Sequence, residues 1–108
     1  MNYYRYDTHV HTSEVSPCGR VPAEEMVELY RKAGYQGILI TDHYHDGVIE
    51  KQNGEWKEKM DDYLMGYRKA KEAGEAVGMD VMLGMELRFQ SGLEDYLVYG
   101  FEEEFLYR

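Results

Sequence analysis

The chain has 108 residues, which is enough for one domain with a single modest core. Its composition, 44% hydrophobic and 31% charged, is that of a globular protein and excludes a disordered tail or a fibrous repeat. The net charge of −9 argues against a nucleic-acid-binding surface, because contact with the phosphate backbone needs clustered positive charge.

Membrane association and secretion are not expected either. No apolar run approaches the length of a transmembrane helix, and the first residues lack the apolar segment of a secretion signal. The single cysteine, Cys18, cannot form an internal disulfide, which fits a reducing compartment. We therefore expect a cytoplasmic protein without a membrane partner.

The first predicted elements are a strand, a helix and a second strand. Residues 3–10 mix aromatic and β-branched side chains, as strands do. A helix is expected to start at Pro22, with acidic residues in its first turn, and to end at Gly34. The continuous apolar run at 37–41 predicts a strand that is buried on both faces, as in a parallel sheet.

The second half of the chain continues this alternation. A polar loop is expected at residues 46–55, followed by one long helix at 56–77 that is closed by Gly78. Two strands are expected at 80–87 and 96–99, separated by a turn around Ser91 and Gly92, and a last helix starts at residue 102. The order β-α-β-α-β-β predicts an α/β fold with mainly parallel strands. In such folds, functional residues gather at the carboxyl ends of the strands.

All four histidines fall into two His-x-His pairs, His9 with His11 and His43 with His45. Residues two apart in a strand point to the same side, so two imidazoles of a pair could converge on one metal ion. Imidazole suits zinc, iron and manganese-type sites. The alternative is that histidines tolerate strand ends and pair by accident. We favour the metal site, because no histidine lies anywhere else in the chain.

Glu86 lies inside the otherwise apolar third strand. An unpaired buried carboxylate would shift its pKa or destabilise the fold, and a role as a bridging ligand between two cations avoids both. The alternative is an ion pair with Arg88, which shares its strand face. We take Glu86 and His43 as candidate catalytic residues as well as metal ligands.

Three acidic residues near the histidines are weaker candidates. Asp7 is expected to share the strand face of His9 and His11 and to orient an imidazole as a hydrogen-bond acceptor, with a capping or solvent role as the alternative. Asp42 faces the opposite side in a regular strand, which makes it a weaker direct ligand than His43. Glu14, in the loop after the first pair, is a candidate additional ligand.

The remaining candidates are left open. His45 lies further into the loop, and a ligand role and an exposed position are equally plausible for it. Cys18 could donate a thiolate, although a lone cysteine is more often a small buried apolar residue. Arg20 and Arg88 could bind a phosphate or carboxylate group, although exposed arginines are common.

Three of these motifs together resemble a known family. His9-Val10-His11-Thr12 is similar to the first motif of the PHP (polymerase and histidinol phosphatase) domain, and Thr41-Asp42-His43 is similar to the second. Glu86 within Gly84-Met85-Glu86 matches the position of the bridging glutamate. The resemblance covers residues 7 to about 99, and it identifies residues 1–108 as the N-terminal part of a PHP domain.

The resemblance implies a distorted (β/α)7 TIM-like barrel, of which the chain would form the N-terminal half with about four strands. It also implies two or three divalent metal ions, usually zinc, manganese or iron, and hydrolysis of phosphoesters. By this resemblance His9 and His11 would bind one metal, His43 would serve another, and Glu86 would bridge two.

The chain departs from the family pattern in two ways. The later motifs, which should add histidines and an Asp-x-His, are absent, and a TIM barrel usually has roughly 250 residues. We therefore expect either a fragment or a natural truncation that a partner or a second copy completes, and an open edge at the fourth strand favours oligomerisation. In addition, Glu14, Pro17 and Cys18 stand where many relatives have a histidine or aspartate ligand.

The expected function is hydrolysis of phosphate mono- or diesters by a metal-activated water, on a phosphorylated small-molecule or nucleotide substrate. The alternative is a catalytically inactive, truncated module for metal binding or assembly. A weaker alternative is a metallohydrolase of the amidohydrolase type, since His-x-His on a first barrel strand also suits that class.

Overall fold

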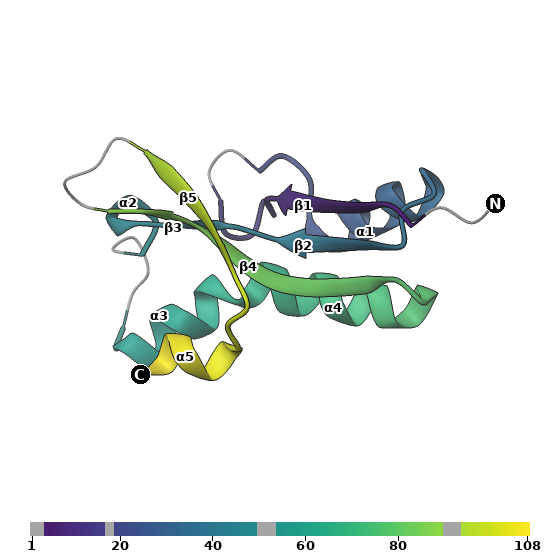
Figure 1. Cartoon of the computed structure of the whole chain (residues 1–108). Coiled ribbons are helices and arrows are strands. Elements are labelled where there is room, and N and C mark those ends of the chain that lie inside the picture. The colour runs from purple at the N-terminus through teal and green to yellow at the C-terminus, as the bar shows by residue number, and fades with distance from the viewer. Residues whose placement is uncertain (1–3, 17–18, 50–53, 90–93) are drawn as a thin grey trace.

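The computed structural model describes residues 4–16, 19–49, 54–89 and 94–108 (Figure 1). Within these residues, strands and helices alternate through most of the chain. The elements in order are β1 (Tyr6–Val10), α1 (Ala23–Lys32), β2 (Gly37–Ile40), β3 (His43–Tyr44), α2 (Asp46–Ile49), α3 (Trp56–Tyr63), α4 (Met65–Val77), β4 (Asp80–Arg88), β5 (Asp95–Tyr99) and α5 (Glu103–Tyr107).

The strands form one mixed sheet in which β4 is the longest member. β1 pairs with β2, and β2 and β3 both pair with β4, all in parallel. The register runs without a shift from Gly37 opposite Asp80 to His43 opposite Glu86, so β2 and β3 are two parts of one interrupted strand. β5 pairs with β4 in the antiparallel direction. The predicted α/β fold with mainly parallel strands is confirmed.

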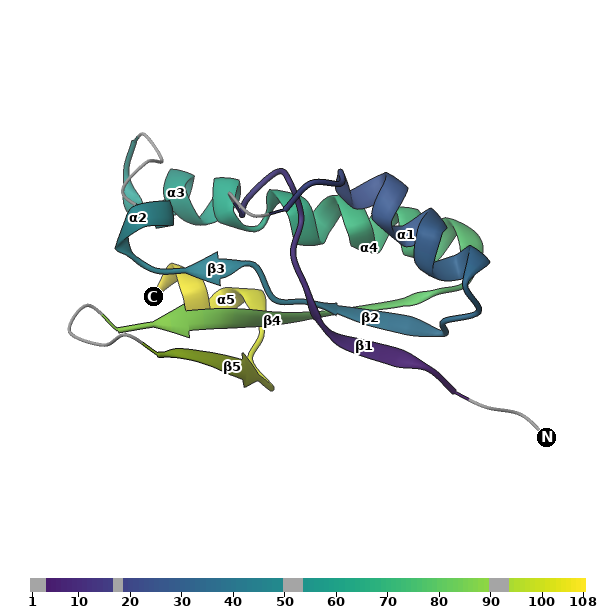
Figure 2. The same ribbon diagram turned by 90° about the horizontal axis from the view of Figure 1, so that it is seen from above.

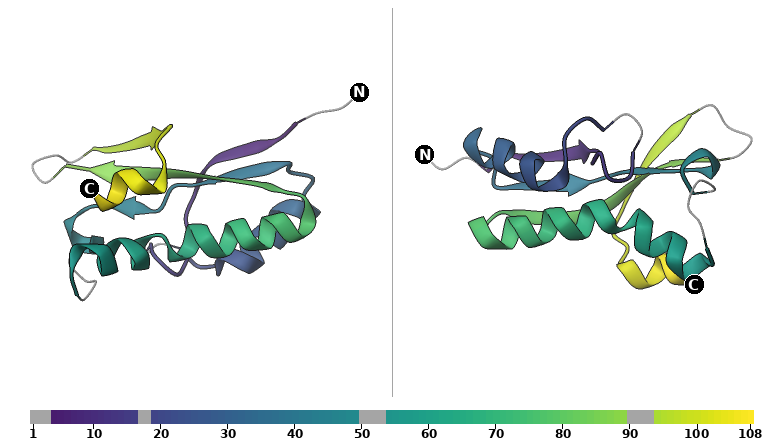
Figure 3. Two further views of the ribbon diagram at one scale, coloured as in Figure 1. Left: turned by 90° about the horizontal axis from the view of Figure 1, so that it is seen from below. Right: turned by 180° about the vertical axis from the view of Figure 1, so that it is seen from behind.

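Helices α1, α3 and α4 cover one face of this sheet (Figures 2 and 3). Two apolar clusters fill the space between the layers. The first is formed by Val10, Ala23, Val27, Ile38, Ile40, Ala70, Met79 and Val81. The second is formed by Val15, Val48, Ile49, Met60, Tyr63, Leu64, Met85 and Leu106. Because side chains alternate along a strand, every second residue of β4 points away from these clusters, and Met82 there stays 41% exposed.

The ends of α1 agree with the sequence prediction. Glu24 and Glu25 lie in its first turn, and Arg31 and Lys32 in its last turn, where they complement the helix dipole. Gly34 follows with a φ of 88°, a left-handed conformation that glycine adopts without a steric penalty. The helix therefore stops where the sequence predicts.

Residues 46–55 do not form the predicted uninterrupted loop. Their first part is the short helix α2, whose backbone amides at Val48 and Ile49 donate to the carbonyl of His45 at 3.0 and 2.9 Å. Val48 and Ile49 are buried in the second apolar cluster, which stabilises this turn. Because polar residues surround this apolar pair, the short helix was not recognisable from the sequence pattern.

The long helix predicted at 56–77 is two helices, α3 and α4, that run end to end with a change of direction (Figure 1). Leu64 lies between them with φ −80° and ψ −5°. Hydrogen bonds of the α-helical type continue on both sides of it, from the Leu64 amide to Met60 and from the Arg68 amide to Leu64, each at 2.9 Å. The predicted ends of the helical region are confirmed, whereas the prediction of one continuous helix is wrong.

Smaller differences occur at three other elements. β1 begins at Tyr6 rather than at residue 3, which is outside the described residues. β5 begins one residue before the predicted strand, at Asp95, and α5 begins at Glu103. The turn predicted around Ser91 and Gly92 also lies outside the described residues. Among the described residues, no helix has the length and apolar character needed to cross a membrane.

Candidate metal centre

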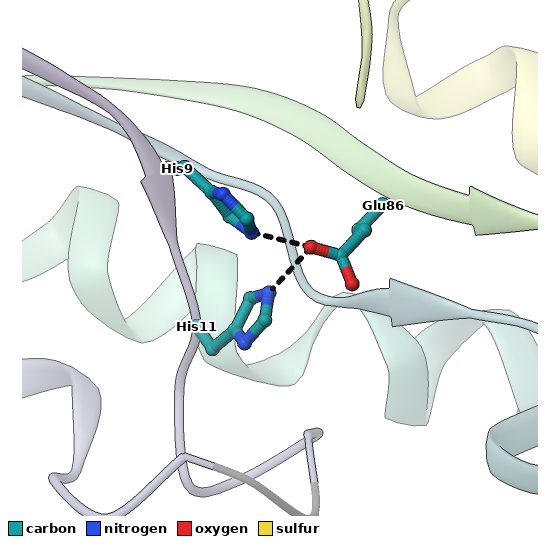
Figure 4. Close-up of side chains that lie close together, drawn as sticks. All are labelled: His9, His11 and Glu86. Atoms are coloured by element: carbon teal, nitrogen blue, oxygen red, sulfur yellow. Dashed lines mark ion pairs between the residues drawn. The ribbon is translucent and has the colours of Figure 1, made fainter. Parts of the chain in front are cut away.

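The first histidine pair lies at the carboxyl end of β1, and both imidazoles point toward Glu86 on β4 (Figure 4). His9 Nε2 makes an ion-pair contact with Glu86 Oε1. His11 Nε2 lies 3.4 Å from the same oxygen. The two imidazoles of the His-x-His motif therefore converge on one carboxylate oxygen, and their convergence on a metal ion stays a prediction.

A third imidazole reaches the other oxygen of Glu86. His43 is the residue directly opposite Glu86 in the pairing of β3 with β4. Its Nδ1 lies 2.8 Å from Glu86 Oε2. The two carboxylate oxygens thus face different histidines, which is the arrangement expected of a carboxylate that bridges two cations.

Glu86 is buried, with only 7% of its side chain exposed. The predicted alternative, an ion pair between Glu86 and Arg88, is not the arrangement found. Arg88 instead binds Asp95 with two hydrogen bonds, from Nε to Oδ1 at 2.7 Å and from Nη2 to Oδ2 at 3.0 Å. The buried carboxylate is therefore compensated by imidazoles, whose nitrogens are also metal ligands.

Two groups of three side chains at this point could hold a cation, and they share Glu86. One consists of His9, His11 and Glu86, and the other of His43, Glu86 and Asp95, with the ligand atoms of each group within 4.8 Å of one another. Neutral imidazole and carboxylate together suit divalent zinc, iron or manganese. The donor set of this structure therefore fits the cations that the sequence implies.

The environment of His11 favours the form that binds metal. Burial lowers the pKa of His11, and the neighbouring His43 lowers it further, while Glu86 opposes both effects. A lowered pKa keeps the imidazole neutral near pH 7, and only the neutral ring has a lone pair free for a cation.

Asp95 is a candidate ligand that the sequence analysis missed. It lies just outside the predicted strand at 96–99, and no recognisable motif surrounds it. The hairpin could have identified Asp95 as a site residue. Pairing of β4 with β5 places Asp95 opposite Arg88, which is two residues along the strand from Glu86. Residues on the same face of neighbouring strands lie close enough to form one site.

Asp7 does not share the strand face of His9 and His11, so that prediction is wrong. Its Oδ2 accepts a hydrogen bond of 2.6 Å from the hydroxyl of Tyr30 on α1. The cause is an irregularity in β1: the three steps from Asp7 to Val10 pair with only two steps of β2, from Ile38 to Ile40. An extra residue of this kind resets the alternation of side chains.

Asp42 holds the segment that follows the first histidine pair. Its carboxylate accepts hydrogen bonds from the Thr12 amide at 2.6 Å, the Thr12 hydroxyl at 2.8 Å and the Ser16 hydroxyl at 2.8 Å. The Ser16 oxygen in turn accepts a bond of 3.0 Å from the His43 amide. Asp42 therefore joins the backbone beside His11 to the backbone of His43, without itself belonging to either group of possible ligands.

Burial raises the pKa of Asp42 to about 6, although its three hydrogen bonds oppose the rise. Since the carboxyl binds a proton more tightly in the folded state, its stabilising effect is fully present below pH 3.8 and is lost as the pH rises through 6. The wild type and Asp42→Asn are compared without metal. We expect the free energy of unfolding of the wild type minus that of Asp42→Asn to fall by about 1 kcal/mol from pH 5 to pH 7. Urea unfolding in the presence of a chelator measures this difference. A difference that grows with pH would contradict the assignment.

The other predicted site residues that the structure describes belong to neither group of possible ligands. Both carboxylate oxygens of Glu14 accept hydrogen bonds from the Ala23 amide, at 3.0 and 3.1 Å, at the N-terminus of α1. This geometry does not support Glu14 as a metal ligand. The His45 ring contacts that of His43, with centroids 5.5 Å apart. Arg20 is exposed in the segment before α1. Cys18 lies outside the described residues.

The chain is similar to a known protein of solved structure. A solved structure of a provisionally assigned metal-dependent phosphoesterase from Bifidobacterium adolescentis superposes with a TM-score of 0.56 and 26% sequence identity. The match covers 85% of this chain and 25% of that one, so the chain spans about a quarter of that protein's length. No curated protein matches the sequence. The sequence model of the PHP domain matches residues 7–106, which include every candidate ligand named above, and the chain therefore belongs to the PHP domain family.

Proposed function

We propose that this chain provides the first metal ligands of a metal-dependent phosphoesterase. The observation that supports this most strongly is the position of Glu86, whose two oxygens contact imidazoles from two different strands. A carboxylate placed between histidines in this way is suited to bridge two cations. Membership of the PHP family and the similarity to the Bifidobacterium structure point to the same chemistry.

In this proposal His9, His11 and Glu86 hold one cation, and His43, Glu86 and Asp95 hold the second. When bound, such cations acidify a water molecule and stabilise the charge that develops on phosphoryl oxygens. The contribution of the protein is to fix the ligands. Asp42 positions the segments that follow His11 and precede His43, so that their imidazoles face the two different oxygens of Glu86.

The remaining parts of the proposal follow from the extent of the match. Residues 1–108 would be part of a PHP domain, and further ligands would come from later segments or from a partner or second copy. The substrate class would be phosphorylated small molecules or nucleotides, and the cations zinc, manganese or iron. A cytoplasmic location is proposed from the single cysteine. Arg20 is an exposed candidate for contact with a phosphate, whereas Arg88 is engaged by Asp95.

Hydrolysis of p-nitrophenyl phosphate and of bis(p-nitrophenyl) phosphate, with added Mn²⁺ or Zn²⁺, tests this function. We expect His9→Ala to reduce kcat/KM by on the order of 100-fold or more, because one cation loses a direct ligand. Lys32→Ala is a suitable control, since Lys32 is an exposed residue at the end of α1. Cation binding without turnover would instead support the inactive metal-binding module. Turnover that is equal in the wild type and His9→Ala would exclude a role for this site.

A further inference from the structure

Arg88 and Asp95 form a two-point ion pair beside Glu86. They lie directly opposite each other in the antiparallel pairing of β4 with β5. The guanidinium donates from Nε and Nη2 to the two different oxygens of the carboxylate, at 2.7 and 3.0 Å. This geometry matches the planar fork of arginine to the carboxylate, which makes the pair directional as well as electrostatic.

The same carboxylate belongs to one of the two groups of possible metal ligands. An oxygen of Asp95 lies within 4.8 Å of ligand atoms of both His43 and Glu86. A cation held by these three residues would need at least one Asp95 oxygen. In the structure, both oxygens accept hydrogen bonds from Arg88. The guanidinium and a second cation would therefore compete for the same two oxygens.

The other group of possible ligands does not meet this competition. His9 and His11 approach Glu86 from β1, whereas Arg88 donates its hydrogen bonds to Asp95, which belongs to the second group. The hydrogen bonds of Arg88 thus engage a possible ligand of the second site and not one of the first. This difference follows from the hairpin register, because β5 places Asp95 directly opposite Arg88.

The ion pair is of a strength that a cation can overcome. The side chains of Arg88 and Asp95 are 44% and 30% exposed, so water screens their attraction. Exposed pairs of this kind are individually weak, and two-point contacts lie toward the upper end of their range.

We propose that Arg88 is a latch that competes with a second cation for the Asp95 carboxylate and is displaced when that cation binds at His43, Glu86 and Asp95. This inference rests on the proposed metal-binding function and extends it. The site of His9, His11 and Glu86 fills first, and the second site fills only as the guanidinium releases Asp95. Arg88 is thus a regulator of cation affinity and not itself a ligand.

Isothermal titration calorimetry with Mn²⁺, and separately with Zn²⁺, tests the latch on the wild type, Arg88→Gln and Arg88→Lys. We expect Arg88→Gln to tighten the weaker binding event by about 2- to 5-fold and to leave the tighter event unchanged. Arg88→Lys keeps the charge but loses the two-point contact, and should give a smaller gain. Circular dichroism confirms that each exposed substitution leaves the fold intact.

Asp95→Asn tests whether Arg88 acts through the Asp95 carboxylate. We expect this change to remove the weaker event, and Arg88→Gln in the same chain to restore nothing, because the latch acts only through the Asp95 carboxylate. A weaker second event in Arg88→Gln would show that Arg88 positions Asp95 for the cation, and would overturn the latch. An unchanged second event would overturn it too, while leaving the metal-binding function standing. A wild-type chain that binds neither cation would overturn both proposals.

Discussion

Glu86→Gln is expected to abolish cation binding at both groups of ligands at once. The substitution keeps the shape of the side chain but removes its negative charge and half of its acceptor capacity. Since Glu86 is the one residue common to both groups, affinity for Mn²⁺ or Zn²⁺ should fall by on the order of 100-fold or more in each. Calorimetric titration and elemental analysis of the purified protein measure this loss.

Single ligand changes should behave differently from Glu86→Gln. His43→Ala is expected to impair one binding event and to spare the other, because His43 belongs to one group only. Glu75→Gln is the matched control for the loss of an acidic charge, since its side chain is 70% exposed on α4, where it contacts Lys71. If Glu86→Gln bound two cations with wild-type affinity, the bridging role would be excluded.

Gly66→Ala is expected to destabilise the protein by about 2–3 kcal/mol, against the usual preference of helices for alanine. Gly66 lies in the first turn of α4, where the helix packs against the segment that follows His11. An added Cβ would overlap the hydroxyl oxygen of Thr12 and lie 3.1 Å from Asp42 Oδ2. Alanine would therefore disturb the hydrogen bonds between Thr12 and Asp42 that position His11.

Urea unfolding of Gly66→Ala measures this cost, and a cation titration shows whether the disturbance reaches His11. Glu72→Ala, on the exposed surface of the same helix, is the control and should change stability by less than about 0.5 kcal/mol. Helix propensity alone predicts the opposite sign, a gain of about 1 kcal/mol for Gly66→Ala. A stabilised variant would mean that the close approach of α4 to Thr12 does not exist in solution.

Much of the fold was predictable because its signals are local. The ends of α1 follow from charged residues in its end turns and from Gly34, and β2 and β4 follow from apolar runs. The failures concern tertiary packing. The short helix α2 depends on burial of Val48 and Ile49 against α3, and periodicity over a few residues cannot reveal such contacts. The break at Leu64 likewise lies inside an uninterrupted helical pattern.

The candidate site shows the same division. His9, His11, His43 and Glu86 were predictable because their residue types are unusual at strand ends, and the parallel order brings those ends together. Asp7 was misplaced because the irregularity in β1 has no sequence signature. Asp95 was missed because an exposed aspartate in a hairpin is common. Only the register of β4 with β5 shows that it lies beside Glu86.

Anomalous diffraction at the absorption edge of manganese or zinc, from crystals grown with the metal, locates the bound cations relative to Glu86. We expect two anomalous peaks, one on each side of the Glu86 carboxylate. The first should lie between His9 and His11, and the second beside His43 and Asp95. Peaks that lie elsewhere, or a single peak that Glu86 does not contact, would contradict a metal centre bridged by this residue.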